Sequence, residues 1–206
     1  VQELADYTVK AFELADKYRI VVMILGDGYL GQMSEPLVFP KAVEKLPEKD
    51  WALTGAKGRD PHIIASLRLN PDNYLEQHVY NLMKIYGEIE ENEVIYDTQY
   101  MDDADFMIVS YGTCSRICKK AIRALRAEGI KVGLFRPITL WPFPKKEIAE
   151  YAKKVKKILT VEMSMGQMVQ DVQINAGKYA DIDFYGRPGG MLPEVDTIIQ
   201  RVKSYV

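Results

Sequence analysis

The sequence is poor in the residues from which metal centres and covalent catalytic sites are usually built. Its 206 residues include two cysteines and two histidines. A structural zinc site or an iron–sulfur cluster uses about four such ligands, so two cysteines are too few. Cys114 and Cys118 lie four residues apart, which places both thiols on one face of a helix. We expect them to be small apolar residues that stay reduced in the cell.

Long apolar runs and a strong net charge are lacking as well. The longest strictly apolar run is residues 20–25, far shorter than the roughly 20 residues of a membrane-spanning helix. A formal net charge of −2 gives no general attraction to nucleic acid or to anionic membranes. No signal-peptide pattern opens the sequence, so the cytoplasm is the expected compartment.

From residue 104 onward, strand patterns and helix patterns alternate regularly. Apolar strand patterns, each followed by a helix pattern, occur at 106–111, 131–136, 157–163 and 182–186. This alternation predicts an α/β fold of three layers (α/β/α), with helices on both faces of a mostly parallel sheet.

The N-terminal part of the sequence predicts an incomplete domain. An amphipathic helix begins almost at the first residue and leads into an apolar strand at 20–25. One helix cannot bury both faces of that strand, so we expect the chain to be a C-terminal fragment of a longer protein. We divide it into the end of one domain at 1–40, a structured connector at 41–103 with a helix over about 72–89, and one compact domain at 104–206.

A Gly-Asp-Gly tripeptide, Gly26-Asp27-Gly28, follows the apolar run. Such a tripeptide can begin the site that holds Mg²⁺ and the diphosphate of thiamine diphosphate, but the site also needs an Asn ligand about 25 to 30 residues later. Residues 48–59 contain no Asn, and Asn70 lies too far along the chain. We therefore expect the tripeptide to be the tight exit of a buried strand.

Other binding motifs are incomplete. The turn after the strand at 106–111 has one glycine, where a dinucleotide-binding fingerprint needs three. His62 and His78 have no companion ligands in the sequence. The lysine-rich stretch at 145–157 fits a solvated helix face, with a docking surface for an acidic protein as the alternative.

Two loops stand out because each follows a predicted strand, at the sheet edge where ligands and partners gather in parallel α/β folds. "FRPITLWPFP" at 135–144 places Trp141 and Phe143 among three prolines. "VEMSMGQM" at 161–168 places Glu162 at the end of an apolar strand. Both patterns fit either a binding site or ordinary loop packing.

Three motifs, "GLFRPITLWPFP", "VEMSMGQMVQDV" and "FYGRPGGMLP", resemble in order and spacing the C-terminal domain of the α subunit of 2-oxoacid:ferredoxin oxidoreductases. "AFELADKYRIVVMILGDGYLGQMSEP" resembles the end of the preceding thiamine-pyrimidine-binding domain, and "WALTGAKGR" fits the connector. The resemblance covers the whole chain and favours the 2-oxoisovalerate (branched-chain) enzymes, with the 2-oxoglutarate and pyruvate enzymes as close rivals. It implies that residues 104–206 form a transketolase C-terminal-like domain.

The resemblance also implies a function. The complete enzyme would oxidatively decarboxylate a 2-oxoacid to an acyl-CoA and reduce ferredoxin, with coenzyme A as a substrate. The partner β subunit would hold thiamine diphosphate and Mg²⁺, and further subunits would carry the Fe–S clusters. No catalytic, cofactor-binding or metal-binding residue is then expected in this chain, and the isolated fragment is expected to be inactive.

In that setting the C-terminal domain serves assembly. Exposed Trp, Phe and Arg side chains are the types that anchor interfaces. The candidate interface residues are Arg136, Trp141, Phe143, Glu162, Gln167 and Arg187. Two alternatives remain open: a non-catalytic interaction or regulatory module, and a self-contained nucleotide-binding α/β domain.

Overall fold

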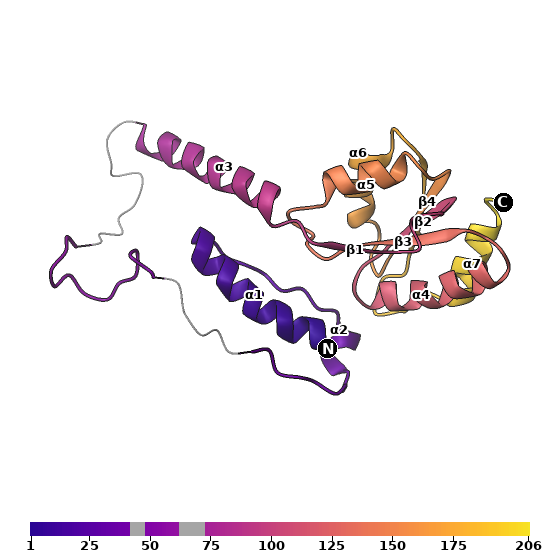
Figure 1. Cartoon of the computed structure of the whole chain (residues 1–206), viewed down its shortest axis with the longest axis horizontal. Helices are drawn as coiled ribbons and strands as arrows, with labels where there is room; N and C mark the ends of the chain where they lie inside the picture. Colours follow the sequence, from indigo (N-terminus) through magenta and orange to yellow (C-terminus); the bar gives the residue numbers. More distant parts are fainter. Residues whose placement is uncertain (42–47, 62–72) are drawn as a thin grey trace. The chain divides into compact units, whose positions relative to one another are not determined.

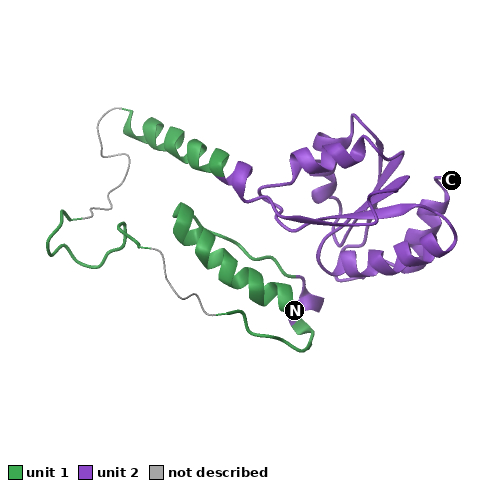
Figure 2. Ribbon diagram, in the orientation of Figure 1, with its two compact units in different colours: residues 1–26, 32–88 green, residues 27–31, 89–206 purple. Residues whose placement is uncertain are grey.

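The computed structural model describes residues 1–41, 48–61 and 73–206 (Figure 1). The chain forms two units, one made of residues 1–26 and 32–88 and the other of residues 27–31 and 89–206 (Figure 2). His62 and Asn70 lie outside the described residues. None of the helices in the described ranges combines the length and the apolar character that crossing a membrane requires.

The first unit contains the expected N-terminal helix, α1 (Gln2–Tyr18), which ends where Arg19 adopts a left-handed conformation with φ 50°. The strand predicted at 20–25 is wrong for this structure: these residues are extended, but they pair with no strand among the described residues. Most of their side chains are exposed to solvent, among them Val21 at 89% and Met23 at 74%. A strand needs a neighbouring strand to satisfy its backbone hydrogen bonds, so an apolar run by itself does not make one.

The helix expected over 72–89 is α3 (Tyr74–Asn92), which begins in the first unit and ends in the second. The second unit also contains a five-stranded sheet in the order β1-β3-β2-β4-β5, in which only β1 is antiparallel to its neighbour. The mostly parallel α/β fold predicted from the sequence is confirmed. The strands are β1 (Tyr96–Gln99), β2 (Phe106–Val109), β3 (Val132–Pro137), β4 (Lys157–Glu162) and β5 (Asp181–Gly186), and the helices are α2 (Gly28–Gln32), α4 (Gly112–Ala127), α5 (Lys145–Ala152), α6 (Met168–Ala176) and α7 (Val195–Lys203).

Helices cover both faces of this sheet (Figure 1). Met107 and Val109 of β2 point into the core under α5 and α6, whereas Phe106 and Ile108 point into the core under α4 and α7. A strand buried on both faces reads as a continuous apolar run, which is why the parallel strands could be recognised from the sequence.

Strand β1 was not predicted, because its four residues, YDTQ, have no apolar periodicity. It pairs with β3 and places Tyr96 opposite Pro137. The Tyr96 ring stacks on Phe135 with 5.3 Å between ring centroids, and Asp97 forms an ion pair with Arg136 at 3.4 Å. Contacts with β3, rather than its own composition, therefore make this segment a strand.

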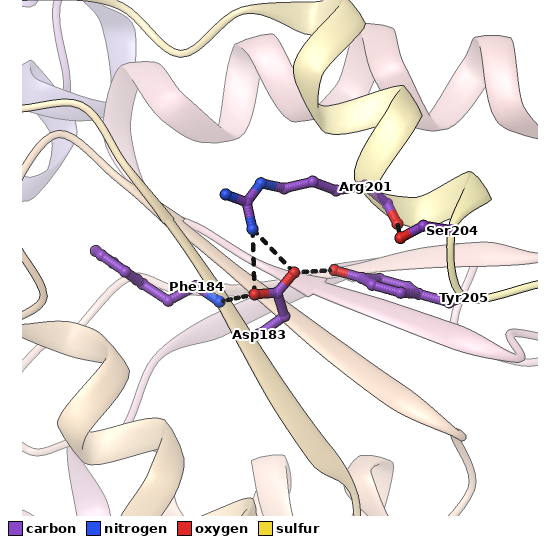
Figure 3. Close-up of polar contacts among 5 residues, drawn as sticks. All are labelled: Asp183, Phe184, Arg201, Ser204 and Tyr205. Carbon is purple, nitrogen blue, oxygen red and sulfur yellow. Dashed lines mark hydrogen bonds and ion pairs between the residues drawn. The ribbon is translucent and has the colours of Figure 1, made fainter.

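The other edge strand, β5, is fastened to α7 and the C-terminal residues through Asp183 (Figure 3). The Asp183 carboxylate accepts hydrogen bonds from Arg201 at 3.1 and 3.2 Å, from the Tyr205 hydroxyl at 2.6 Å and from the Phe184 N–H at 2.8 Å. Partial burial acts to raise the pKa of Asp183, but the bonds from Tyr205, Phe184 and Arg201 outweigh it and lower that pKa. Burial and the Asp183 carboxylate raise the pKa of Tyr205.

Tyr205→Phe should change the alkaline stability of the protein. Because the folded-state pKa of Tyr205 lies above its ordinary value of 10.0, its contribution is complete below that value and is lost as the pH rises above it. The free energy of unfolding of the wild type, measured by urea titration, should therefore fall more steeply than that of Tyr205→Phe between about pH 9 and pH 11. Tyr80→Phe, which alters an exposed tyrosine on α3, is the control. Equal slopes for the wild type and Tyr205→Phe would contradict the assignment.

Candidate functional site

The parallel strands β3, β2, β4 and β5 all end at one edge of the sheet, which we call the carboxyl edge. The chain leaves β2 through α4 toward β3, and it leaves β4 through α6 toward β5, so the connections diverge between β2 and β4. Open α/β sheets form their binding crevices at such a switch point. The loops of the carboxyl edge are 110–111, 138–144, 163–167 and 187–194.

Glu162, at the end of β4, is 1% exposed and lies inside the second unit. One of its carboxylate oxygens accepts hydrogen bonds from the Ser164 hydroxyl at 2.9 Å and from the N–H groups of Gln167 and Met168 at 3.2 and 3.1 Å. The other oxygen accepts the Val169 N–H at 3.0 Å. The first N–H groups of a helix have no partner within the helix, so Glu162 caps α6 from the neighbouring strand.

The side chain of Asp27, in the Gly-Asp-Gly tripeptide, contacts the start of α4, next to the turn that joins β2 to α4. Its carboxylate accepts the Leu30 N–H at 2.8 Å and the Thr113 N–H at 3.4 Å. Partial burial acts to raise the pKa of Asp27, but hydrogen bonds from Thr113, Leu30 and Tyr29 outweigh it and lower that pKa. A carboxylate is favourable at the positive end of the α4 dipole. The Asp27 carboxylate of the tripeptide therefore places a negative charge at the N-terminus of α4.

Both cysteines are buried on α4, as expected for apolar residues. Burial raises the pKa of Cys114 to about 12, and the carboxylates of Asp27 and Glu162 add to the effect. Burial also raises the pKa of Cys118 to about 12. The thiolate is the form that reacts and binds metals, so these thiols are poor nucleophiles and poor ligands at neutral pH. Within the described ranges, no three His, Cys, Asp or Glu side chains gather as a metal site.

The structure places the six candidate interface residues around the carboxyl edge, with unequal exposure. Trp141 is 52% exposed and Gln167 is exposed, whereas Phe143, at 4% exposure, packs into the core under α5 and α6. Arg136 is mostly buried beside Asp97. Arg187 is partly exposed and forms an ion pair with Glu194, and Glu162 caps α6 as described above.

Two exposed methionines at this edge were not among the predicted residues. Met165, 77% exposed, lies in the loop after β4, and Met191 lies exposed in the loop after β5. The motifs "VEMSMGQM" and "FYGRPGGMLP" could have indicated these two residues, because in each motif a methionine follows a strand end and neighbours glycine. The opposite edge of the sheet carries the exposed charged residues Asp102, Asp103, Lys131, Lys154 and Lys156 together with the exposed tyrosines Tyr100 and Tyr179. Trp141, Met165 and Met191 are the exposed large apolar side chains of the carboxyl-edge loops, and exposed apolar side chains close together are typical of interaction surfaces.

Comparison with known proteins identifies a domain within the second unit. Residues 104–198 match the sequence family described as pyruvate:ferredoxin oxidoreductase core domain II. Residues 104–198 belong to this domain family. The core domain II therefore comprises β2 through the first half of α7, and it includes every loop of the carboxyl edge.

Relatives match nearly the whole chain. A ketoisovalerate oxidoreductase subunit VorB of Methanothermobacter marburgensis is 45% identical over 205 residues, 99% of this chain and 58% of the relative. A 2-oxoglutarate synthase subunit KorA of the same organism is 32% identical over 98% of this chain and 61% of the relative. The chain thus spans about three fifths of the length of these relatives. The resemblance to subunits of 2-oxoacid:ferredoxin oxidoreductases is confirmed.

A solved structure shares the fold. The 2-oxoglutarate:ferredoxin oxidoreductase from Magnetococcus marinus matches 82% of this chain and 28% of that chain, with a TM-score of 0.56 and 22% sequence identity. At this identity the match shows the fold alone.

Proposed function

We propose that this chain is part of the α subunit of a 2-oxoacid:ferredoxin oxidoreductase that depends on thiamine diphosphate and Fe–S clusters. The enzyme would oxidatively decarboxylate a 2-oxoacid to an acyl-CoA and transfer the electrons to ferredoxin. The names of the relatives support this activity. The higher identity to the ketoisovalerate subunit, 45% against 32%, favours a branched-chain 2-oxoacid as the substrate.

The residues described do not fit a site for the cofactors of that reaction. Within the described ranges, Asp27 belongs to no group of three His, Cys, Asp or Glu side chains that could hold a metal ion, and its carboxylate already accepts the Leu30 and Thr113 N–H groups. Both cysteines are buried, and two thiols are too few to hold an Fe–S cluster. As the family resemblance implies, we propose that the partner β subunit holds thiamine diphosphate and Mg²⁺ and that further subunits carry the Fe–S clusters.

Assembly with these subunits is the proposed role of this part of the chain, through the carboxyl edge of core domain II. The observation that supports it is the exposure of Trp141, Met165 and Met191 on three separate loops of one edge. Aromatic and methionine side chains are enriched in the buried centres of protein interfaces. The alternative of a nucleotide-binding domain is disfavoured, because Asp27 occupies the N-terminus of α4, where a phosphate would bind.

Trp141→Ala, made in the full-length subunit, tests this proposal. If Trp141 is a central anchor, the dissociation constant for the thiamine-binding subunit should rise by about thirtyfold, corresponding to about 2 kcal/mol. Isothermal titration calorimetry or surface plasmon resonance gives the constant. Tyr179→Ala is the matched control, because Tyr179 is a partly exposed aromatic residue at the opposite edge of the sheet. Unchanged affinity together with reduced stability would make Trp141 a packing residue and defeat the proposal.

A further inference from the structure

Residues 27–31 contact the start of α4 and the loop 187–194, which are distant from them in sequence. Asp27 accepts the Thr113 N–H at the start of α4. Tyr29, two residues later, donates its hydroxyl hydrogen to the Gly190 carbonyl oxygen at 2.9 Å. The Asp27 carboxylate also accepts the Leu30 N–H and so shapes the first turn of α2. This five-residue segment belongs to the same unit as residues 89–206, although 57 residues separate it from them in sequence.

The charge of Asp27 is favourable at the start of α4. The N-terminus of a helix attracts anions, and α4 has 16 residues. Gly112, its first residue, has a φ of 55°, a left-handed conformation that favours glycine, and the Asp27 carboxylate lies next to it. The segment is therefore anchored at the start of α4.

The loop that Tyr29 reaches has little packing of its own. Gly189 and Gly190 have φ values of 70° and 78°, and no atom lies within 4 Å of the position that a Cβ would take at either residue. The base of the loop is held by the ion pair of Arg187 with Glu194. Glycine has the greatest backbone freedom, so the tip of this loop depends on contacts such as the bond from Tyr29.

We propose that residues 27–31 are a pin that holds the loop 187–191 in the conformation bound by the thiamine-binding subunit. Asp27 binds the pin to the start of α4, and Tyr29 holds Gly190 through its hydrogen bond. Both are positioning residues, since they act through the loop that carries Arg187 and Met191. The proposal rests on the proposed function, in which the carboxyl edge is the assembly surface.

Hydrogen–deuterium exchange on the full-length subunit tests the pin. Asp27→Ala should speed exchange of the amides at both 112–116 and 187–191 by about fivefold, the usual consequence of losing a capping carboxylate. Asp27→Asn keeps a neutral acceptor and should restore part of the protection. Tyr29→Phe should speed exchange at 187–191 and leave 112–116 unchanged. The matched controls are Asp102→Ala, at the opposite edge of the sheet, and Tyr80→Phe, on α3 in the first unit, and both should leave exchange at 112–116 and 187–191 unchanged.

The same variants are then titrated with the thiamine-binding subunit. Asp27→Ala and Tyr29→Phe should each raise the dissociation constant severalfold. Unchanged exchange at 187–191 in both variants would overturn the pin, and so would faster exchange with wild-type affinity. The outcome is separable from the test of the proposed function: if Trp141→Ala leaves assembly intact, the assembly surface is wrong, whatever the exchange data show.

Discussion

Glu162→Ala should lower the free energy of unfolding by about 3 kcal/mol or more. Glu162 is fully buried, and its two oxygens accept hydrogen bonds from the Ser164 hydroxyl and from three backbone N–H groups at the start of α6. Alanine would leave the Met168 and Val169 N–H groups buried without an acceptor, and each orphaned buried donor costs about 1 to 3 kcal/mol. The loop 163–167 would also lose the group around which it folds, so Met165 and Gln167 at the carboxyl edge should become mobile.

Urea unfolding followed by far-ultraviolet circular dichroism measures this loss. Glu162→Gln keeps an oxygen acceptor of nearly the same shape, so its cost should be clearly smaller than that of Glu162→Ala. Glu91→Ala is the control, because Glu91 is an exposed glutamate at the end of α3, and its replacement should have little effect. If Glu162→Ala and Glu91→Ala had equal stability, Glu162 would not be the cap of α6.

Phe135→Ala should be the other strongly destabilising substitution, with a loss of about 3 to 5 kcal/mol. Phe135 is completely buried in β3, and its ring stacks on Tyr96 and meets the edge of Tyr151 at a centroid distance of 5.8 Å. The substitution would remove a large apolar side chain and leave a cavity between the sheet and α5, beside the rings of Tyr96 and Tyr151.

The same urea titration gives the size of the effect, and hydrogen–deuterium exchange gives its location. Exchange should rise most in β1, because Tyr96 stacks directly on the Phe135 ring. Phe135→Leu retains most of the apolar volume and should cost less than half as much. Exchange that rose uniformly, without preference for β1, would show that Phe135 does not hold this strand.

The architecture of residues 104–206 could be predicted from the sequence, since the physical causes are local. Strands buried on both faces must be apolar throughout, as in Phe106–Val109, and amphipathic helices must show one apolar face. The regular alternation of these two patterns leaves few arrangements other than a parallel sheet covered by helices. The loops after these strands could be singled out for the same reason, because their place at the carboxyl edge follows from the alternation.

Whether the segments 20–25 and 96–99 form strands could not be predicted in this way. Residues 20–25 are as apolar as any buried strand, yet they have no strand partner among the described residues. Tyr96–Gln99 is polar, yet it pairs along β3. Pairing depends on a neighbour that is distant in sequence, and no local pattern reports whether that neighbour is present.

The sequence by itself determined the α/β class, the carboxyl-edge loops and the kinship with 2-oxoacid:ferredoxin oxidoreductase subunits, because apolar periodicity and motif spacing are written along the chain. Only the tertiary structure decided what the polar groups of those loops do. From the sequence, Glu162 was a candidate interface residue, and Asp27 was expected only at the exit of a buried strand. The fold turns each toward the N-terminus of a helix, α6 for Glu162 and α4 for Asp27. The reason is physical: unpaired N–H groups at a helix start require an acceptor, and which carboxylate supplies it depends on three-dimensional proximity.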